Sequence, residues 1–284
     1  MNTRLRFIAD THAGARAGLV PPRYWSEDMG PLPRAMWEWY VATVAALPRA
    51  RLCVHVGDMT DGEGKKGTVG LFETDVGKQA GIGAEVVREA NAEEYRLVRG
   101  TPFHTDGATA YEDRVADLLG APIADECYLS VHGVRIAVRH VVGKSGTPYG
   151  QETLLSKERH RDMLDALRTE SQDARLIVRG HVHSYQYIED ARHAALIVPC
   201  FMWPGFDPYG RTQRAFSYDI GFVDVLIEDD GEIRVRKYLM PWTMTRREYE
   251  EIDGGGNVGP VGAAGGTVGQ EAGSGAAGDV RDRA

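Results

Sequence analysis

The chain has 284 residues, of which 43% are hydrophobic and 26% are charged, and its formal net charge is −8. This composition is that of an ordinary globular protein, with room for one large α/β domain or two smaller ones. The acidic balance argues against broad, sequence-independent binding to nucleic acid. No apolar run approaches the length of about 18 residues that a membrane span needs, so we expect no membrane association.

The N-terminal segment and the cysteines bear on the compartment. The segment MNTRLRFIAD leads directly into a strand-like pattern, so we expect no cleaved signal peptide. The three cysteines, Cys53, Cys127 and Cys200, are odd in number and widely spaced, a pattern that does not indicate a disulfide framework. We therefore expect a cytoplasmic protein with free thiols.

The first half of the chain alternates short apolar runs with stretches of helical periodicity. The expected elements are, in order, a strand at Leu5–Asp10, a helix at Arg34–Leu47, a strand at Arg51–Asp58, a helix around Gln79–Ala90, a strand at Glu94–Gly100 and a helix at Tyr111–Gly120. Strands that alternate with helices are typical of a parallel or mixed sheet.

The second half contains hairpins as well. We expect hairpins that turn at His132-Gly133 and at Asp230-Gly231. A long amphipathic helix, Gln151–Glu170, lies between them and precedes a buried strand at Leu176–Val178. The pattern favours a mixed sheet, or two sheets packed face to face with helices outside.

The C-terminal segment differs in composition from the rest. Residues 254–284 are rich in Gly and Ala and nearly free of large apolar side chains. Such a segment cannot bury enough apolar surface to offset the entropy lost on ordering. We therefore expect a single domain at 1–253 and a disordered tail at 254–284.

Ligand-type side chains follow the predicted strands at the points where each strand ends. In open α/β sheets, ligands gather at the carboxyl ends of the strands. A single His-x-His pair arises easily by chance, but five strand ends in one chain carry a carboxylate or an imidazole. These residues are Asp10 and His12, Asp58 and Asp61, His104, His140, and His181 with His183. Imidazole and carboxylate ligands suit Zn, Fe and Mn, and a carboxylate next to a glycine, as in Gly57-Asp58, is suited to bridging two ions.

The motifs Asp10-x-His12, Gly57-Asp58-x-x-Asp61, His140 and Gly180-His181-x-His183 resemble those of the calcineurin-like metallophosphoesterases, in the same order, over about residues 4 to 241. The resemblance implies a four-layer α/β/β/α sandwich of two mixed β-sheets flanked by helices, with a dinuclear metal centre at the strand ends. It also implies a ligand set: Asp10, His12, Asp58 and His183 for one ion, and Asp58, His140 and His181 for the other. Mn²⁺ is the expected metal, with Fe, Zn, Ni or Mg as alternatives.

The resemblance also implies an activity. Members of this family hydrolyse phosphomonoesters or phosphodiesters by attack of a metal-bound hydroxide. We expect a metallophosphoesterase, with a phosphodiester such as a nucleotide or nucleic acid favoured over a monoester. The alternative is a non-catalytic protein-interaction scaffold on the same fold. The oligomeric state is left open.

The third motif departs from the family pattern Gly-Asn-His-Asp/Glu. The segment here is RGTPFHTDG, so Thr101 stands in place of the Asn ligand and the nearest histidine, His104, comes two residues late. We expect a local bulge that brings His104 to the site as the proton donor, with Asp106 as its orienting partner. Thr101, water or His104 itself would fill the ligand position of the missing Asn. Asp61 is expected to hold a histidine or the loop backbone rather than to bind metal.

Three long loops follow the predicted strand ends and carry the candidate substrate pocket. Arg16, Lys65 and Trp203 represent these loops. Basic and aromatic side chains together suit a nucleotide or the end of a nucleic acid. For each residue taken alone, ordinary loop packing is the competing explanation. His55 lies inside a predicted strand, and we expect it to be a core histidine without a catalytic role.

Overall fold

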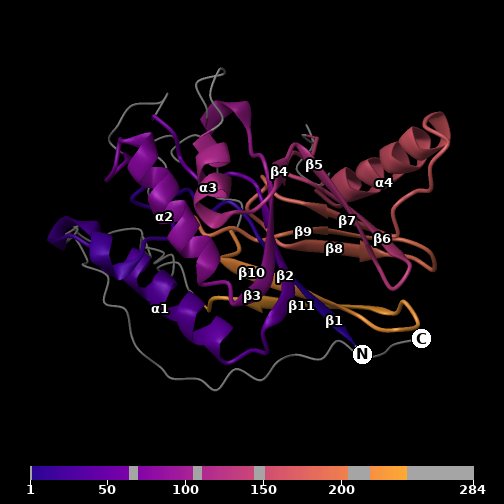
Figure 1. The fold of residues 1–284 in the computed structure, drawn as a ribbon, viewed down its shortest axis with the longest axis horizontal. Coiled ribbons are helices and arrows are strands. Elements are labelled where there is room, and N and C mark those ends of the chain that lie inside the picture. Colours follow the sequence, from indigo (N-terminus) through magenta and orange to yellow (C-terminus); the bar gives the residue numbers. More distant parts are fainter. Residues whose placement is uncertain (1, 64–69, 105–110, 144–150, 204–217, 242–284) are drawn as a thin grey trace, which may run out of the picture. The chain divides into compact units, whose positions relative to one another are not determined.

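The computed structural model describes residues 2–63, 70–104, 111–143, 151–203 and 218–241 (Figure 1). Residues Met1–Met240 form one compact unit, and Pro241–Ala284 are assigned to a second. Of the second unit only Pro241 is described, so the predicted tail at 254–284 and the domain boundary before it lie outside the described residues.

Two sheets carry the described strands. The first has the order β11-β10-β1-β2-β3-β4, in which β1 to β4 run parallel and β10 and β11 antiparallel to their neighbours. Its strands are β1 (Thr3–Ile8), β2 (Ala50–Val56), β3 (Ala92–Val98), β4 (Ile123–Ala124), β10 (Gly221–Ile227) and β11 (Ile233–Leu239).

The second sheet is also mixed and has the order β5-β6-β7-β9-β8. The three inner strands are parallel, and the two edge strands are antiparallel to them. The strands are β5 (Glu126–Val131), β6 (Val134–Arg139), β7 (Leu176–Arg179), β8 (Gln186–Glu189) and β9 (Ala194–Ile197).

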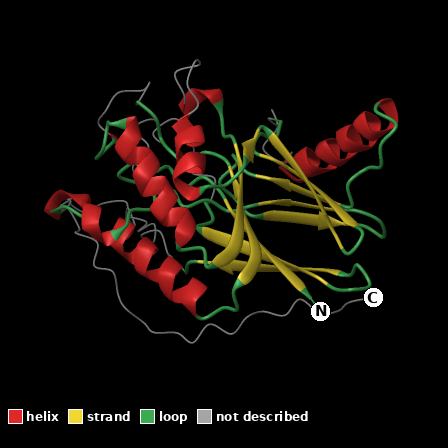
Figure 2. Ribbon diagram, in the orientation of Figure 1, coloured by secondary structure: helices red, strands yellow, loops and turns green. Residues whose placement is uncertain are grey.

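The helices lie outside the sheets (Figures 1 and 2). Helices α1 (Pro31–Ala45), α2 (Val76–Arg88) and α3 (Tyr111–Leu119) lie on the side of the first sheet, and α4 (Gln151–Arg168) lies on the side of the second. Helix α1 begins directly after Gly30, and its buried residues recur at helical spacing from Met36 to Val44. Helix α2 is capped by the side chain of Asp75, which accepts the backbone N–H of Lys78 at 2.9 Å.

The main hydrophobic core lies between the two sheets. It joins residues such as Phe7 and Val54 of the first sheet to Ile136, Val178 and Leu196 of the second. A smaller cluster packs Leu154 and Leu155 of α4 against the outer face of the second sheet. The predicted arrangement of two mixed sheets flanked by helices is therefore confirmed.

Three short strands, β4, β8 and β9, were not predicted. Strand β8 is half-exposed along most of its length, and β4 has only two residues. Neither has a run of buried apolar side chains, so pairing with a neighbouring strand decides their conformation.

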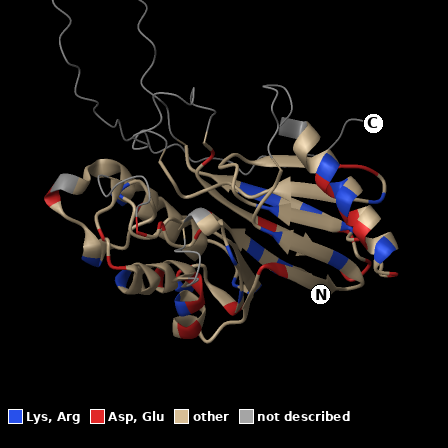
Figure 3. Ribbon diagram, turned by 90° about the horizontal axis from the view of Figure 1, so that it is seen from above, with Lys and Arg blue, Asp and Glu red and all other residues tan. Residues whose placement is uncertain are grey.

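Charged residues are spread over both sheets and α4, where basic and acidic side chains alternate (Figure 3). In the part of the chain that the structure describes, no helix is both long and apolar enough to cross a membrane.

The register of the parallel strands brings the predicted ligands together. In the first sheet Ile8 pairs with His55, and Val56 pairs with Val98. In the second sheet Val138 pairs with Val178. Parallel strands end at the same edge of a sheet, so the loops after β1, β2 and β3 meet, and so do those after β6 and β7. The backbone N–H of His181 donates to Oδ2 of Asp10 at 3.1 Å, which joins the two sets of loops.

Candidate metal centre

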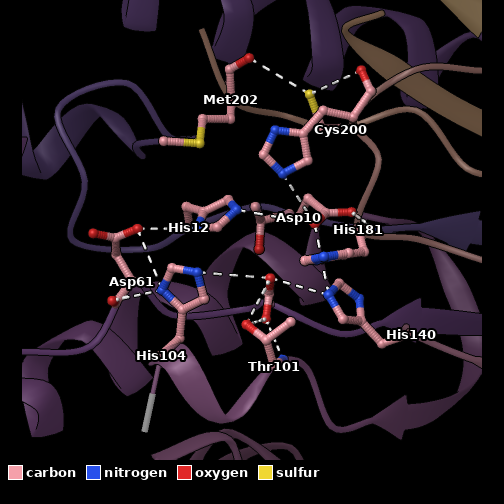
Figure 4. A network of polar contacts seen from close by, with 12 residues as sticks. Asp10, His12, Asp61, Thr101, His104, His140, His181, Cys200 and Met202 are labelled. Atoms are coloured by element: carbon pink, nitrogen blue, oxygen red, sulfur yellow. Dashed lines mark hydrogen bonds and ion pairs between the residues drawn. The ribbon is translucent and has the colours of Figure 1, made fainter. Parts of the chain in front are cut away.

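The predicted ligands form two clusters at this edge. Asp10, His12 and His183 form the first cluster, and Asp58, His140 and His181 form the second. Within each cluster, one ligand-type atom from every residue lies within 4.8 Å of the others. In Figure 4, His12 lies on one side of Asp10, and His140 and His181 lie on the other.

The two clusters are neighbours. The Oδ1 atom of Asp10 lies 3.2 Å from Nε2 of His183 and 4.0 Å from Nε2 of His12 in its own cluster. The same oxygen lies 3.9 Å from Nε2 of His140 in the other cluster. The Oδ2 atom of Asp58 lies 3.0 Å from His140 Nε2. Two aspartates therefore lie between histidines that come from both sheets.

The backbone at these residues is unusual. Asp10, His12, Asp58, His181 and His183 all have positive φ, between 44° and 72°. Non-glycine residues in this left-handed region cost free energy, and they persist where the surrounding structure holds them. The clusters thus lie on sharp turns that begin as each strand ends.

Glycines make room for the ligands. A Cβ on Gly57 would lie 2.5 Å from Cγ of His140, and one on Gly180 would lie 2.9 Å from the carbonyl oxygen of Val56. Both distances are shorter than a side chain tolerates. Glycine is therefore required at both positions, because a side chain on Gly57 would overlap His140 and one on Gly180 would overlap the backbone of Val56.

Hydrogen bonds orient the histidines. The Nδ1 atom of His140 donates to the carbonyl oxygen of Val56 at 2.5 Å, and Nδ1 of His12 donates to Oδ1 of Asp61 at 3.0 Å. Metal-binding histidines commonly donate their other ring N–H in this way. In the neutral form of both rings, Nε2 then faces the centre as an acceptor. Asp61 accepts from His12, and the expectation that it does not bind metal stays a prediction.

Three buried polar atoms at the centre have no hydrogen-bond partner among the described residues. They are Oδ1 of Asp10, Nε2 of His12 and Nε2 of His140. Buried polar atoms are nearly always paired. Acceptor atoms of carboxylate and imidazole that face one another without donors fit a divalent cation of the Zn, Fe or Mn type. The residues present therefore fit the metal that the resemblance implies.

Electrostatic coupling within the centre is strong. Burial tends to raise the pKa of Asp58, but His140 and the neighbouring histidines hold that pKa well below its usual range. Burial tends to lower the pKa of His140, but Asp58 and Asp10 raise it to about 10. Both aspartates are therefore ionised, since the pKa of Asp10 is also lowered, by His140 and His183 against the effect of burial. The centre attracts positive charge.

The structure places His104 beside the second cluster. His104 ends a 3-10 turn, Pro102–His104, and its Nδ1 atom donates to the carbonyl oxygen of Asp61 at 2.8 Å. Its Nε2 atom lies 3.7 Å from Oδ2 of Asp58. Burial lowers the pKa of the His104 imidazole. The orienting group seen here is the backbone of Asp61, whereas the predicted partner Asp106 lies outside the described residues.

Thr101 contacts Asp58 twice. Its backbone N–H donates to Oδ1 of Asp58 at 2.7 Å, and its hydroxyl lies 3.2 Å from the same oxygen. The hydroxyl therefore serves to orient the carboxylate of Asp58. Whether Thr101, water or His104 takes the position of the missing Asn stays a prediction.

The pocket residues are only partly placed. The backbone N–H of Arg16 donates to Gly70, and that of Trp203 donates to Ala17, both at 2.8 Å. The loop that carries Arg16 therefore contacts both the segment at Gly70 and the loop that carries Trp203. Lys65 lies outside the described residues, and the role of all three in substrate binding stays a prediction.

Three further residues at the centre were not singled out in the sequence. Tyr218 places its ring edge-on to His183, with ring centroids 4.9 Å apart. The thiol of Cys200 donates to the carbonyl oxygen of His183 at 3.7 Å. Glu112, in the first turn of α3, contacts the backbone beside Asp58. No local motif marks these positions, because each reaches the centre only through the tertiary fold.

His55 is buried, as expected. Its Nε2 atom lies 3.0 Å from the hydroxyl of Thr11. Burial lowers the pKa of His55 to about 3, so the ring is neutral and packs beneath the centre.

Comparisons with known proteins yielded structures only. No protein-family model and no curated protein matches the chain. A single mutant of Vps29 from Entamoeba histolytica matches with a TM-score of 0.45 and 14% identity, over 84% of this chain and 100% of that chain. A predicted phosphoesterase from Streptococcus pneumoniae TIGR4 matches with a TM-score of 0.38 and 11% identity, over 84% and 99%. A novel archaeal phosphodiesterase matches with a TM-score of 0.40 and 10% identity, over 83% and 100%.

These TM-scores lie below 0.5, so we draw no conclusion on activity from them. The fold is established by the two sheets and their strand order. Those sheets, with helices on both outer faces, agree with the fold that the resemblance to calcineurin-like metallophosphoesterases implied.

Proposed function

We propose that this protein is a dinuclear metal-dependent phosphoesterase. The observation that supports the proposal is the pair of adjacent clusters, Asp10/His12/His183 and Asp58/His140/His181. Three of their acceptor atoms, Oδ1 of Asp10 and Nε2 of His12 and His140, are buried and have no hydrogen-bond donor among the described residues. Two cations in such a site would neutralise the phosphoryl oxygens and activate water for in-line attack.

Each cluster would hold one ion, and Asp58 is proposed to serve both. Mn²⁺ is the first metal to test, with Zn, Fe, Ni and Mg as alternatives. The left-handed turns and the hydrogen bonds to Val56 and Asp61 fix the positions of the ligands. Such preorganisation lowers the reorganisation needed during the reaction.

His104 is proposed as the proton donor to the leaving group. Because a carbonyl oxygen can only accept, the contact with Asp61 fixes the proton of neutral His104 on Nδ1. Its Nε2 atom faces the side of Asp58. Only the imidazolium form can donate from Nε2, so His104 would act as a general acid after taking up a proton.

The proposed substrate is a phosphodiester, such as a nucleotide or the end of a nucleic acid, rather than a monoester. The loops that carry Arg16 and Trp203 would offer a cation for phosphate and a ring for a base. The net charge of −8 favours a small or locally bound substrate over a long nucleic acid.

Metal content and hydrolysis, measured together, test the proposal. The full chain is loaded with Mn²⁺, dialysed and assayed for metal, then tested with bis(p-nitrophenyl) phosphate and p-nitrophenyl phosphate. We expect two ions per chain and faster hydrolysis of the diester. Asp58→Ala should lose both ions, and His160→Ala, an exposed histidine on α4, should keep both.

The competing function is that of a protein-interaction scaffold. The feature that favours it is Thr101 in place of a ligand Asn. Wild-type protein that takes up no stoichiometric metal and hydrolyses neither ester would support the scaffold. Loss of only one ion in Asp58→Ala would be compatible with the proposed enzymatic function but would overturn the proposed bridging role of Asp58.

A further inference from the structure

The carboxylate of Glu112 joins two loops of the metal centre. Its Oε1 atom accepts the backbone N–H of Met59 at 2.7 Å, and its Oε2 atom accepts the backbone N–H of Gly100 at 2.6 Å. Met59 directly follows Asp58, and Gly100 directly precedes Thr101. One side chain from α3 therefore holds the end of β2 and the end of β3 together.

These contacts form a closed ring around Asp58. Glu112 binds the amide of Gly100, and the next amide along, that of Thr101, donates to Oδ1 of Asp58 at 2.7 Å. Met59 follows Asp58 in the chain, and its backbone N–H donates to Glu112, which closes the ring. Since Asp58 has a positive φ of 52°, something must hold its backbone in place, and the bond to Met59 does so from the residue that follows.

Glu112 is an unusual choice for a purely structural role. It is 3% exposed, and among the described residues its carboxylate accepts from two backbone amides rather than from a cationic side chain. Burial and the charge of Asp58 raise its pKa to about 7, against the effect of the two amides. A buried carboxylate is costly. Glutamine has nearly the same shape but only one acceptor oxygen, so its NH₂ group would face one of the two N–H donors.

We propose that Glu112 is a positioning residue of the metal centre, which sets the place of Asp58 and Thr101 through their neighbouring amides. The inference rests on the proposed metal-dependent function. Groups that orient metal ligands typically contribute about 10–100-fold to metal affinity or activity. The effect should therefore exceed what docking of α3 alone would produce.

The matched control is Asp113→Asn. Asp113 lies in the same turn of α3 but pairs with the guanidinium of Arg99, and its side chain is 48% exposed. This variant removes a carboxylate from the same helix end but leaves the amides of Met59 and Gly100 with their acceptor. We expect its metal affinity and turnover to match those of the wild type.

The experiment measures Mn²⁺ binding by calorimetry on the full chain, and kcat and KM on bis(p-nitrophenyl) phosphate. Glu112→Gln should bind Mn²⁺ at least about 10-fold more weakly and lose a similar factor in kcat, with KM little changed. Wild-type affinity and kcat in folded Glu112→Gln would overturn the inference, even if the melting temperature fell.

A second variant keeps the test decisive if Glu112→Gln does not fold. Glu112→Asp retains the buried charge but is one methylene shorter, so it cannot reach both amides, and the same weakened binding is expected. If neither variant folds, Glu112 serves stability and the inference fails. The metal titration does not depend on turnover, so wild-type protein that binds Mn²⁺ without hydrolysis refutes the proposed function alone.

Discussion

Gly100→Ala is expected to displace Asp58, because no space exists for even one methyl group. A Cβ on Gly100 would lie 2.0 Å from Oδ1 of Asp58, 2.3 Å from its backbone nitrogen and 2.8 Å from its Cα. Rotation of the Asp58 side chain would relieve only the first contact. The clash with backbone requires the ends of β2 and β3 to separate by roughly 1 Å, since nonbonded atoms approach to about 3.5 Å.

The magnitude follows from this geometry. Overpacking a core typically costs about 1–3 kcal/mol in the free energy of unfolding. For a domain of about 150–250 residues, each kcal/mol lowers the melting temperature by about 2–4 °C. A melting temperature lower by about 2–12 °C is therefore expected. A displacement of about 1 Å in a catalytic group can cost about 100-fold in rate. We therefore expect kcat to fall by about that factor even though the protein stays folded.

Thermal unfolding, Mn²⁺ binding and diester hydrolysis are the measurements. Gly81→Ala is the matched control, because Gly81 lies inside α2 and nothing lies within 4 Å of its added Cβ. Replacing a helical glycine at such a site should stabilise the protein by about 0.4–1 kcal/mol. If Gly100→Ala melts and binds Mn²⁺ like the wild type, the close contact between Gly100 and Asp58 is not part of the native centre.

Three further predictions concern the proton donor, the thiols and the tail. His104→Ala should keep its metal and lose little rate on the p-nitrophenyl ester, but lose about 10²–10⁴-fold on an ester with an unactivated leaving group. Loss of one ion with equal rate losses on both esters would instead make His104 a ligand, and unchanged rates would end its functional role. Burial raises the pKa of Cys53 to about 12 and also raises that of Cys200, so both thiols should resist Ellman's reagent until the protein unfolds; rapid reaction of all three cysteines in native protein would contradict this. Deletion of 254–284 should leave the melting temperature and activity nearly unchanged, and a drop of several degrees would show that this segment packs on the domain.

The sequence by itself determined the elements and the ligand types. Buried runs such as that at Leu176–Val178 predicted strands, because consecutive apolar side chains need cover on both faces. The hairpins at His132-Gly133 and Asp230-Gly231 followed from turn residues that tolerate positive φ, and both lie between the strands expected on either side. The strand-end histidines and aspartates were visible because each comes at or within a few residues of the end of a predicted strand.

Only the tertiary structure decided how those residues act on one another. That Thr101 binds Asp58, and that the backbone of Asp61 orients His104, depends on contacts between chain segments 43 residues apart. Glu112 is one polar residue among several on a short helix, and its sequence neighbours give no sign of its partners. The local sequence pattern predicts burial and turns along the chain. The hydrogen bonds of the candidate metal centre instead join the ends of different strands, so their geometry is set only when the two sheets pack together.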